Sequence, residues 1–289
     1  MNINWYQCYA TFAVSMSVLI SGMNFAWPSP SIPKLLEGTN TVKITSDEAS
    51  WLAVMFLIGS IFGGLVAGRA INRFGRLKTI LFSSASYIGA WIALAFANHV
   101  AILFSSRFLA GFTDSFAYTS VTMYVGEIAD PHIRGFLGSY LAVTVIIGML
   151  LVNALGLYLS VQTTALISIS IPVLVVVMCF GLPESPYFYI MNGRNEEAIK
   201  SLNKFKKSDV VQAEFLRLKT SIDEEMKNKG RFVDIFQVPY YRKTLIILTT
   251  LRCAKQFVGI SAITFYTDTI FSEMDSGISS EIWVILFTS

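Results

Sequence analysis

Charge and reactive chemistry are both scarce in this sequence. Only 14% of its 289 residues are charged and the mean hydropathy is +0.57, which is too apolar for the core of an ordinary soluble domain. The three cysteines, Cys8, Cys179 and Cys253, lie in apolar segments without metal or redox spacing. The sequence also lacks a set of nucleophile, base and orienting residue that would indicate an enzyme. We therefore expect no enzyme activity, no metal, no cofactor and no nucleic-acid partner.

The few charges are clustered, so long apolar stretches remain between them. A helix needs about 20 apolar residues to cross a bilayer core of about 30 Å. Seven stretches reach that length, namely 8–27, 51–68, 79–97, 101–125, 136–159, 165–182 and 244–271. An eighth begins near Ile282, but as a helix it would rise only about 12 Å before Ser289. These segments predict an all-α, multi-pass integral membrane protein in a lipid bilayer, whose chain is truncated at its C-terminal end.

The basic residues indicate orientation, because Lys and Arg accumulate in cytoplasmic loops. The loop after the second segment holds four basic residues and no acid, and twelve more lie between positions 194 and 243. The loops after the third and fifth segments have neither Lys nor Arg. The pattern predicts a cytoplasmic N-terminus. It argues against a seven-helix receptor, whose N-terminus lies outside.

The long basic loop at 184–242 is predicted to be a cytoplasmic linker made of helices. Asn195 is the expected N-cap of the first helix, which has acids in its first turn and lysines near its end. A second helix places an apolar stripe on one face, formed by Val211, Phe215, Leu218, Ile222 and Met226.

Four short motifs lie at segment boundaries, at 68–76, 107–111, 127–135 and 183–186. Five of their charged residues fall at the cytoplasmic ends of the segments, and these are Arg73, Arg76, Glu127, Arg134 and Glu184. Opposite charges at one depth can pair across helices, and pairs that form in one state only can act as a gate. The alternative is that they are orientation signals and surface ion pairs worth about 0–1 kcal/mol each.

Ionisable residues inside a membrane are costly and indicate function. Arg107 and Asp114 lie in the fourth segment, and Arg252 and Lys255 lie in the seventh. At 1.5 Å per residue, Asp114 is about 20 Å from the outer end of its segment, and the two basic residues are about 12 and 17 Å from the inner end of theirs. These depths are compatible with a salt bridge between Asp114 and Arg252 or Lys255. They are equally compatible with a Lys255 side chain that faces a water-filled cavity.

The seventh segment is also interrupted by polar residues and a glycine at 256–261. Transporters bind substrate near the midplane at discontinuous helices of this kind. Gln256, Ser261, Thr264 and Tyr266 supply donors and acceptors for a polyhydroxylated ligand. The residues expected to bind substrate are Gln256, Ser261, Tyr266, Asn24 and Lys255. A helix kink without a ligand is the alternative.

Taken together, these motifs resemble the signatures of the sugar porter family of the major facilitator superfamily, most closely those of insect facilitated trehalose transporter-like proteins. The resemblance implies two six-helix bundles joined by a helical cytoplasmic domain, alternating access to a central sugar site, and a plasma-membrane location. The chain would then supply the first bundle (1–183), the linker (184–242) and the start of the second bundle (243–289). It also implies that Arg76, Glu127, Arg134 and Glu184 share a cytoplasmic salt-bridge network.

The resemblance leaves three functions open, which are facilitative uniport of trehalose or a hexose, proton-coupled sugar symport, and a non-transporting role as a sensor or regulatory partner. Asn24 stands where proton-linked members carry an aspartate, which favours uniport because an amide cannot titrate. Asp114 keeps the proton-coupled alternative open. Lys255 and Ser261 depart from the family's amide residues in segment seven, and this motivates the non-transporting alternative.

Overall fold

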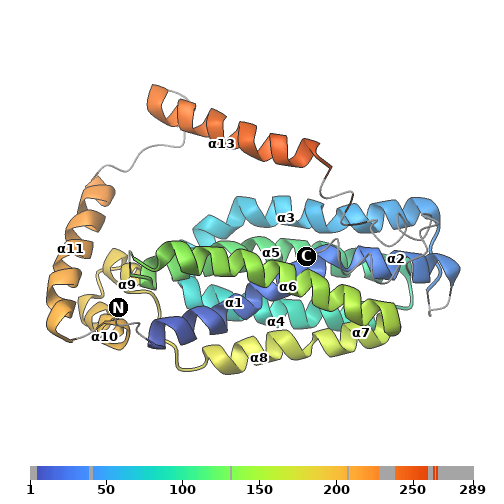
Figure 1. Cartoon of the computed structure of the whole chain (residues 1–289), viewed down its shortest axis with the longest axis horizontal. Helices are drawn as coiled ribbons and strands as arrows, with labels where there is room; N and C mark the ends of the chain where they lie inside the picture. The colour runs from blue at the N-terminus through green and yellow to red at the C-terminus, as the bar shows by residue number, and fades with distance from the viewer. Residues whose placement is uncertain are drawn as a thin grey trace.

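The protein is a bundle of long helices with a smaller group of helices at one end (Figure 1). The computed structural model describes residues 5–38, 42–130, 132–206, 208–227, 238–259, 263 and 265. Within these ranges all regular secondary structure is helical, which confirms the prediction of an all-α fold. The N-terminus lies at the end of the bundle that carries the small helices, and α13 (Pro239–Phe257) stands apart from the bundle beside α3 (Ser46–Phe74).

Six stretches of helix run along the bundle, and two of them are broken. The unbroken ones are α3, α4 (Arg76–Ala95), α5 (Val100–Ile128) and α6 (Arg134–Tyr158), and the broken ones are α1 (Trp5–Ala26) with α2 (Pro28–Glu37) and α7 (Val161–Ser168) with α8 (Ser170–Cys179). Five of the six are long and apolar enough to cross a membrane by length and composition, and α5 is the exception. Four helices, α1, α3, α4 and α6, contact α5, and its charged residue Arg107 is fully buried.

The two breaks have local causes. Pro28 follows the fully buried Trp27, so the chain restarts as α2 with a proline in its first turn, a position that needs no amide hydrogen. Lys34 on α2 then donates to the carbonyl oxygens at the end of α6, those of Leu159 at 2.7 Å and Gly156. Pro172 explains the second break, because it lacks an N–H group and its ring crowds the preceding turn.

Glycine lets two pairs of helices touch backbone to backbone. A Cβ atom built on Gly111 of α5 would lie 1.8 Å from the carbonyl oxygen of Phe56 on α3. The same holds between α1 and α6, where a Cβ on Gly148 would lie 2.1 Å from the Leu19 carbonyl oxygen. Small residues allow this approach in membrane proteins, where dispersion replaces the hydrophobic effect between helices. These contacts fix the position of α5 at the centre of the bundle.

The linker helices at the end of the bundle have their own apolar core. They are α9 (Pro186–Met191), α10 (Asn195–Phe205) and α11 (Ser208–Lys227). Three residues of the expected stripe, Val211, Phe215 and Ile222, are buried in this core, whereas Met226 is 43% exposed. The expected cap was wrong, because Arg194 is the N-cap of α10, no side chain caps it, and Asn195 is the first helical residue.

The close contact between α3 and α5 can be tested with two identical substitutions. We expect Gly111→Ala to lower the melting temperature of the purified protein, since its methyl group would meet the Phe56 carbonyl. Gly89→Ala on α4 is the matched control, because nothing lies within 4 Å of its Cβ position. The control gains up to about 1 kcal/mol of helix propensity and should melt at the same or a higher temperature. Equal melting temperatures for the two variants would contradict the packing described here.

Candidate functional site

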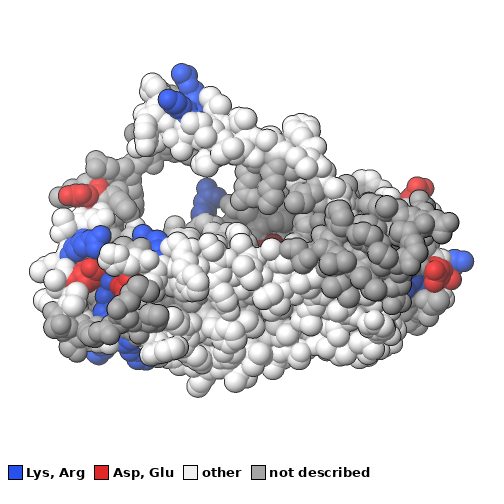
Figure 2. All heavy atoms as spheres, in the orientation of Figure 1, with Lys and Arg blue, Asp and Glu red and all other residues white. Residues whose placement is uncertain are grey.

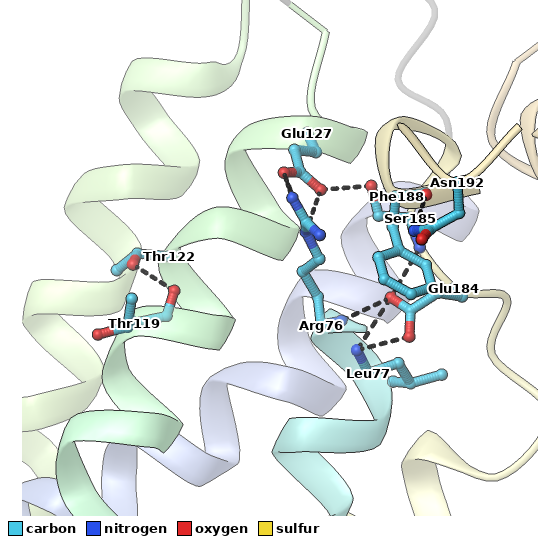
Figure 3. A network of polar contacts seen from close by, with 9 residues as sticks. All are labelled: Arg76, Leu77, Thr119, Thr122, Glu127, Glu184, Ser185, Phe188 and Asn192. Carbon is cyan, nitrogen blue, oxygen red and sulfur yellow. Dashed lines mark hydrogen bonds and ion pairs between the residues drawn. The ribbon is translucent and has the colours of Figure 1, made fainter. Parts of the chain in front are cut away.

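A fully buried arginine lies at the cytoplasmic end predicted for the bundle. Arg76 is the first residue of α4, and its side chain is 1% exposed. Its guanidinium forms a fork with Glu127 near the end of α5, with Nε at 3.1 Å from both carboxylate oxygens and Nη2 at 2.9 Å from Oε1 (Figure 3). Such bidentate charge-assisted bonds fix geometry as well as contributing energy.

Glu184 completes this cluster by capping α4 from a distant part of the chain. Its carboxylate accepts hydrogen bonds from the backbone N–H groups of Arg76 and Leu77 at 3.0 Å (Figure 3). These are unpaired amides at the positive end of the helix dipole, where a carboxylate is stabilising. Gly75 is required in this turn for two reasons: its φ is +102°, and a Cβ there would lie 2.4 Å from Glu184 Oε2.

The segment around Glu184 also binds Glu127 and covers Arg76. The Ser185 hydroxyl donates to Glu127, and the Tyr124 hydroxyl on α5 donates to the Pro183 carbonyl at 2.7 Å. The ring of Phe188 on α9 lies 5.4 Å from the Arg76 guanidinium carbon. We call Arg76, Glu127, Glu184 and Ser185 the Arg76 cluster. It joins the beginning of α4, the end of α5 and the segment that leads into the linker helices.

The other two residues of the predicted gate lie outside this cluster. Arg73 and Arg134 are both exposed, and neither guanidinium group has a hydrogen bond or ion pair in the described part of the chain. Arg134 lines a cleft of about 260 Å³ between the bundle and the linker helices, and Glu127 lines it too. The network implied for Arg134 is therefore not formed in this structure. The Glu127 oxygens are already used by Arg76 and Ser185.

A second polar seam lies inside the bundle between α1, α4 and α5. Arg107 is fully buried and donates through Nη2 to the Asn24 carbonyl oxygen on α1 at 2.8 Å. Its guanidinium also lies over the ring of Trp27, at 4.9 Å from the centroid. Two turns along α5, Asp114 accepts a 2.9 Å hydrogen bond from Tyr87 of α4. Both intramembrane charges on α5 therefore have partners inside the first bundle.

The predicted substrate-binding residues are only partly described. Asn24 is 2% exposed, and its Nδ2 donates to the Ile20 carbonyl oxygen at 3.0 Å. Gln256 is exposed on the last turn of α13, which ends one residue later, and Gly259 follows with φ at +79°. The helix thus ends where the sequence predicted an interruption. Ser261, Tyr266 and the side chains of Arg252 and Lys255 lie outside the described residues.

Sequence reasoning missed three contributors to these two sites. Ser185 and Tyr124 join the segment before α9 to α5, and Tyr87 is the partner of Asp114. Only the position of Ser185 inside the 183–186 motif could have pointed to it. Tyr124 and Tyr87 read as ordinary aromatic residues of apolar segments, since their partners are 59 and 27 positions away.

Known proteins with similar sequences identify the family. The family model described as "Sugar (and other) transporter" matches residues 7–288. The chain belongs to this family. It is 31% identical to the facilitated trehalose transporter Tret1 of Apis mellifera ligustica and 31% identical to that of Polypedilum vanderplanki, in each case over 97% of this chain and 56% of the relative. The chain thus spans about half the length of these curated relatives.

Solved structures show the same fold. The chain superposes with a TM-score of 0.83 on the proton:xylose symporter XylE bound to 6-bromo-6-deoxy-D-glucose, at 23% identity over 99% of this chain and 66% of that one. A partially occluded inward-open form of XylE from E. coli gives a TM-score of 0.79 at 22% identity. These likenesses confirm the predicted major facilitator fold, and the family confirms that the helices belong in a membrane.

Breaking the Arg76–Glu127 pair should cost this protein far more stability than breaking a surface ion pair. Breaking a buried pair from one side costs about 3–5 kcal/mol, because the remaining charge stays buried without a partner. We expect Arg76→Met to lower the melting temperature strongly and Arg76→Met/Glu127→Gln to recover part of the loss. Arg217→Met is the control, because that arginine is 70% exposed and 3.5 Å from Glu214. A similar melting temperature for Arg76→Met and the control would rule out the importance assigned to the pair.

Proposed function

We propose that the protein carries a sugar, trehalose or a hexose, across a membrane by facilitative uniport through alternating access. The observation that carries this proposal is the sugar transporter family match over residues 7–288. The curated relatives named as facilitated trehalose transporters support the choice of cargo and the facilitative mode. Asn24 also supports uniport, because its amide side chain cannot titrate.

The proposed sugar site lies between the first bundle and the end of α13. Asn24 would contribute from α1, and Gln256, Ser261, Tyr266 and Lys255 would contribute from α13 and the residues after it. A polyhydroxylated cargo needs several donors and acceptors, which amides, hydroxyls and an ammonium group supply. The end of α13 at Phe257 supports this placement, because transporters bind substrate where a membrane helix is interrupted.

The Arg76 cluster is the proposed cytoplasmic gate. It ties α4 and α5 to the linker, so its contacts favour the state in which these elements lie together. Arg73 and Arg134 lie exposed near the cluster, where they are free to pair with other groups when the transporter changes state. A gate of this kind acts by a difference in contact energy between states.

We also propose that the linker end of the bundle faces the cytoplasm and that the protein resides in the plasma membrane. In Figure 2, Lys and Arg gather with a few acids around the linker helices, and the visible length of the bundle is mostly uncharged. The N-terminus lies at that same end. The positive-inside rule then favours a cytoplasmic N-terminus.

Uptake of labelled sugar is the direct test of this function. The full-length protein in sealed vesicles should show saturable uptake of trehalose or a hexose that stops at equal concentrations and does not change with a proton uncoupler. Unlabelled cargo should compete, and vesicles without protein should show no saturable component. The absence of uptake for every sugar tested would overturn the proposal.

A second candidate function, proton-coupled sugar symport, is favoured by one observation. Asp114 is an ionisable residue inside the bundle, and its carboxylate accepts a hydrogen bond from the Tyr87 hydroxyl. The Tyr87 hydroxyl also lies 3.4 Å from the Ser21 hydroxyl on α1, which extends the polar seam between helices. Carboxylates in such seams serve as proton relays in transporters.

Asp114→Asn separates the two candidates. Under uniport, an inward proton gradient should not drive sugar above its outside concentration in either the wild type or the variant. Tyr87→Phe serves as a control, because it removes the hydrogen bond while keeping the carboxylate. Gradient-driven accumulation in the wild type that is lost in Asp114→Asn would replace uniport by symport.

A further inference from the structure

A second cleft on the linker end has only positively charged residues among its charged lining residues. It has a volume of about 230 Å³ and lies between the turn that joins α3 to α4 and the turn that joins α9 to α10. Its lining residues are Arg73, Phe74, Lys78, Phe188, Asn192 and Arg194. Three of the six are cationic and none is acidic, which distinguishes it from the cleft beside Arg134, where Glu127 and Glu214 also line the wall.

Most of this positive charge is not neutralised by the protein. Arg194 donates through Nη2 to Glu197 at 2.7 Å, and this contact holds the pKa of Glu197 below its usual range. Glu197 itself is not part of the lining. Arg73 and Lys78 have no ion pair with any residue that the structure describes. The cleft is therefore lined by two cations without an ion-pair partner among the described residues, Arg73 and Lys78. A third cation, Arg194, is shared with Glu197.

The polar geometry of the cleft suits a phosphate group. Guanidinium groups bind phosphate oxygens through paired N–H donors, and an ammonium group adds a compact point charge. Asn192 adds an amide at the wall, and it is oriented by the hydrogen bond from its Nδ2 to the Phe188 carbonyl oxygen at 2.8 Å. A sugar has no charge to match these groups, so the cleft is not a second cargo site.

The surroundings of the cleft favour a phosphate that belongs to a lipid. Phe74, the last residue of α3, is 58% exposed, and Phe82 on α4 is 62% exposed one turn beyond Lys78. Along α3 the apolar side chains of Leu65 and Ile61 are also exposed. Apolar surface therefore begins at the edge of the cleft and continues along the membrane-spanning helices, which is where acyl chains would lie.

We propose that this cleft binds the phosphate of an anionic phospholipid, with the headgroup between Arg73, Lys78 and Arg194 and the acyl chains along Phe74 and Phe82. Basic residues at the membrane surface attract anionic lipids of the cytoplasmic leaflet. Phe188 both lines the cleft and lies over Arg76, so a bound headgroup contacts the same ring that covers the Arg76 cluster. Lipid binding would thus hold the linker against the start of α4.

The test measures lipid binding, so its outcome does not depend on whether the protein transports sugar. The full-length protein would be reconstituted in nanodiscs with either phosphatidylglycerol or phosphatidylcholine, and bound lipid would be counted by native mass spectrometry. Arg73→Gln/Lys78→Gln/Arg194→Gln removes the three cations. Lys200→Gln/Lys204→Gln/Arg217→Gln is the matched control, since it removes the same charge from exposed positions of α10 and α11 outside the cleft.

We expect the cleft variant to lose phosphatidylglycerol binding by about tenfold or more, given the attraction of each basic residue for an anionic surface, while the control retains it. An equal loss in the two variants would show general charge attraction and overturn the site. If the protein binds both lipids equally and millimolar glycerol phosphate displaces them from the cleft, the cleft binds a free phosphate. That result would overturn the proposed lipid site. Melting temperatures confirm folding, and Arg73→Lys/Arg194→Lys should restore most binding.

Discussion

The buried charge of Arg76 is the constraint on which the linker end of the molecule depends. An unpaired guanidinium without solvent contact costs several kcal/mol, and only a well-formed set of partners offsets that cost. The partners come from three places in the chain. Glu127 at the end of α5 pairs with the guanidinium, and the ring of Phe188 on α9 covers it. The segment Pro183–Ser185 binds Glu127 and the Tyr124 hydroxyl of α5. None of them can move away alone without exposing the charge or leaving it unpaired, so the three elements behave as one unit.

The same logic explains why α5 occupies the centre. It carries Arg107, Asp114 and Glu127, which would be costly on a surface that faces lipid. The glycine contact at Gly111 brings α3 against one side of α5, while α1 and α4 supply the carbonyl of Asn24 and the hydroxyl of Tyr87 on another. Polar residues lower the hydropathy of α5, and its central position keeps these residues away from the lipid. Its low hydropathy is therefore a consequence of its place in the fold.

The sequence predicts the parts of this structure that depend on local pattern. The apolar segments, the stripe at Val211, Phe215 and Ile222, and the break after Gln256 all follow from composition or periodicity over short windows. Most contacts between distant positions do not follow from such windows, and the pairing of Arg76 with Glu127 is expected only from the charges at one depth and from the family resemblance. Glu184 caps α4 across 108 residues through backbone amides, which leave no trace in side-chain identity. Arg134 is exposed and its guanidinium has no partner among the described residues, so its place in the network stays a prediction.

Several polar contacts hold the linker helices against the first bundle. Gln7 on α1 donates to the Phe205 carbonyl at the end of α10 at 2.9 Å, and Lys206 pairs with Asp130 beyond the end of α5 at 2.8 Å. The Ser201 hydroxyl donates to the Glu184 carbonyl oxygen at 2.7 Å, directly beside the Arg76 cluster. A motion of α10 relative to the bundle would have to break all of these contacts together. A signal at the linker, such as a bound headgroup, therefore reaches α4 and α5 through rigid contacts rather than through a chain of independent steps.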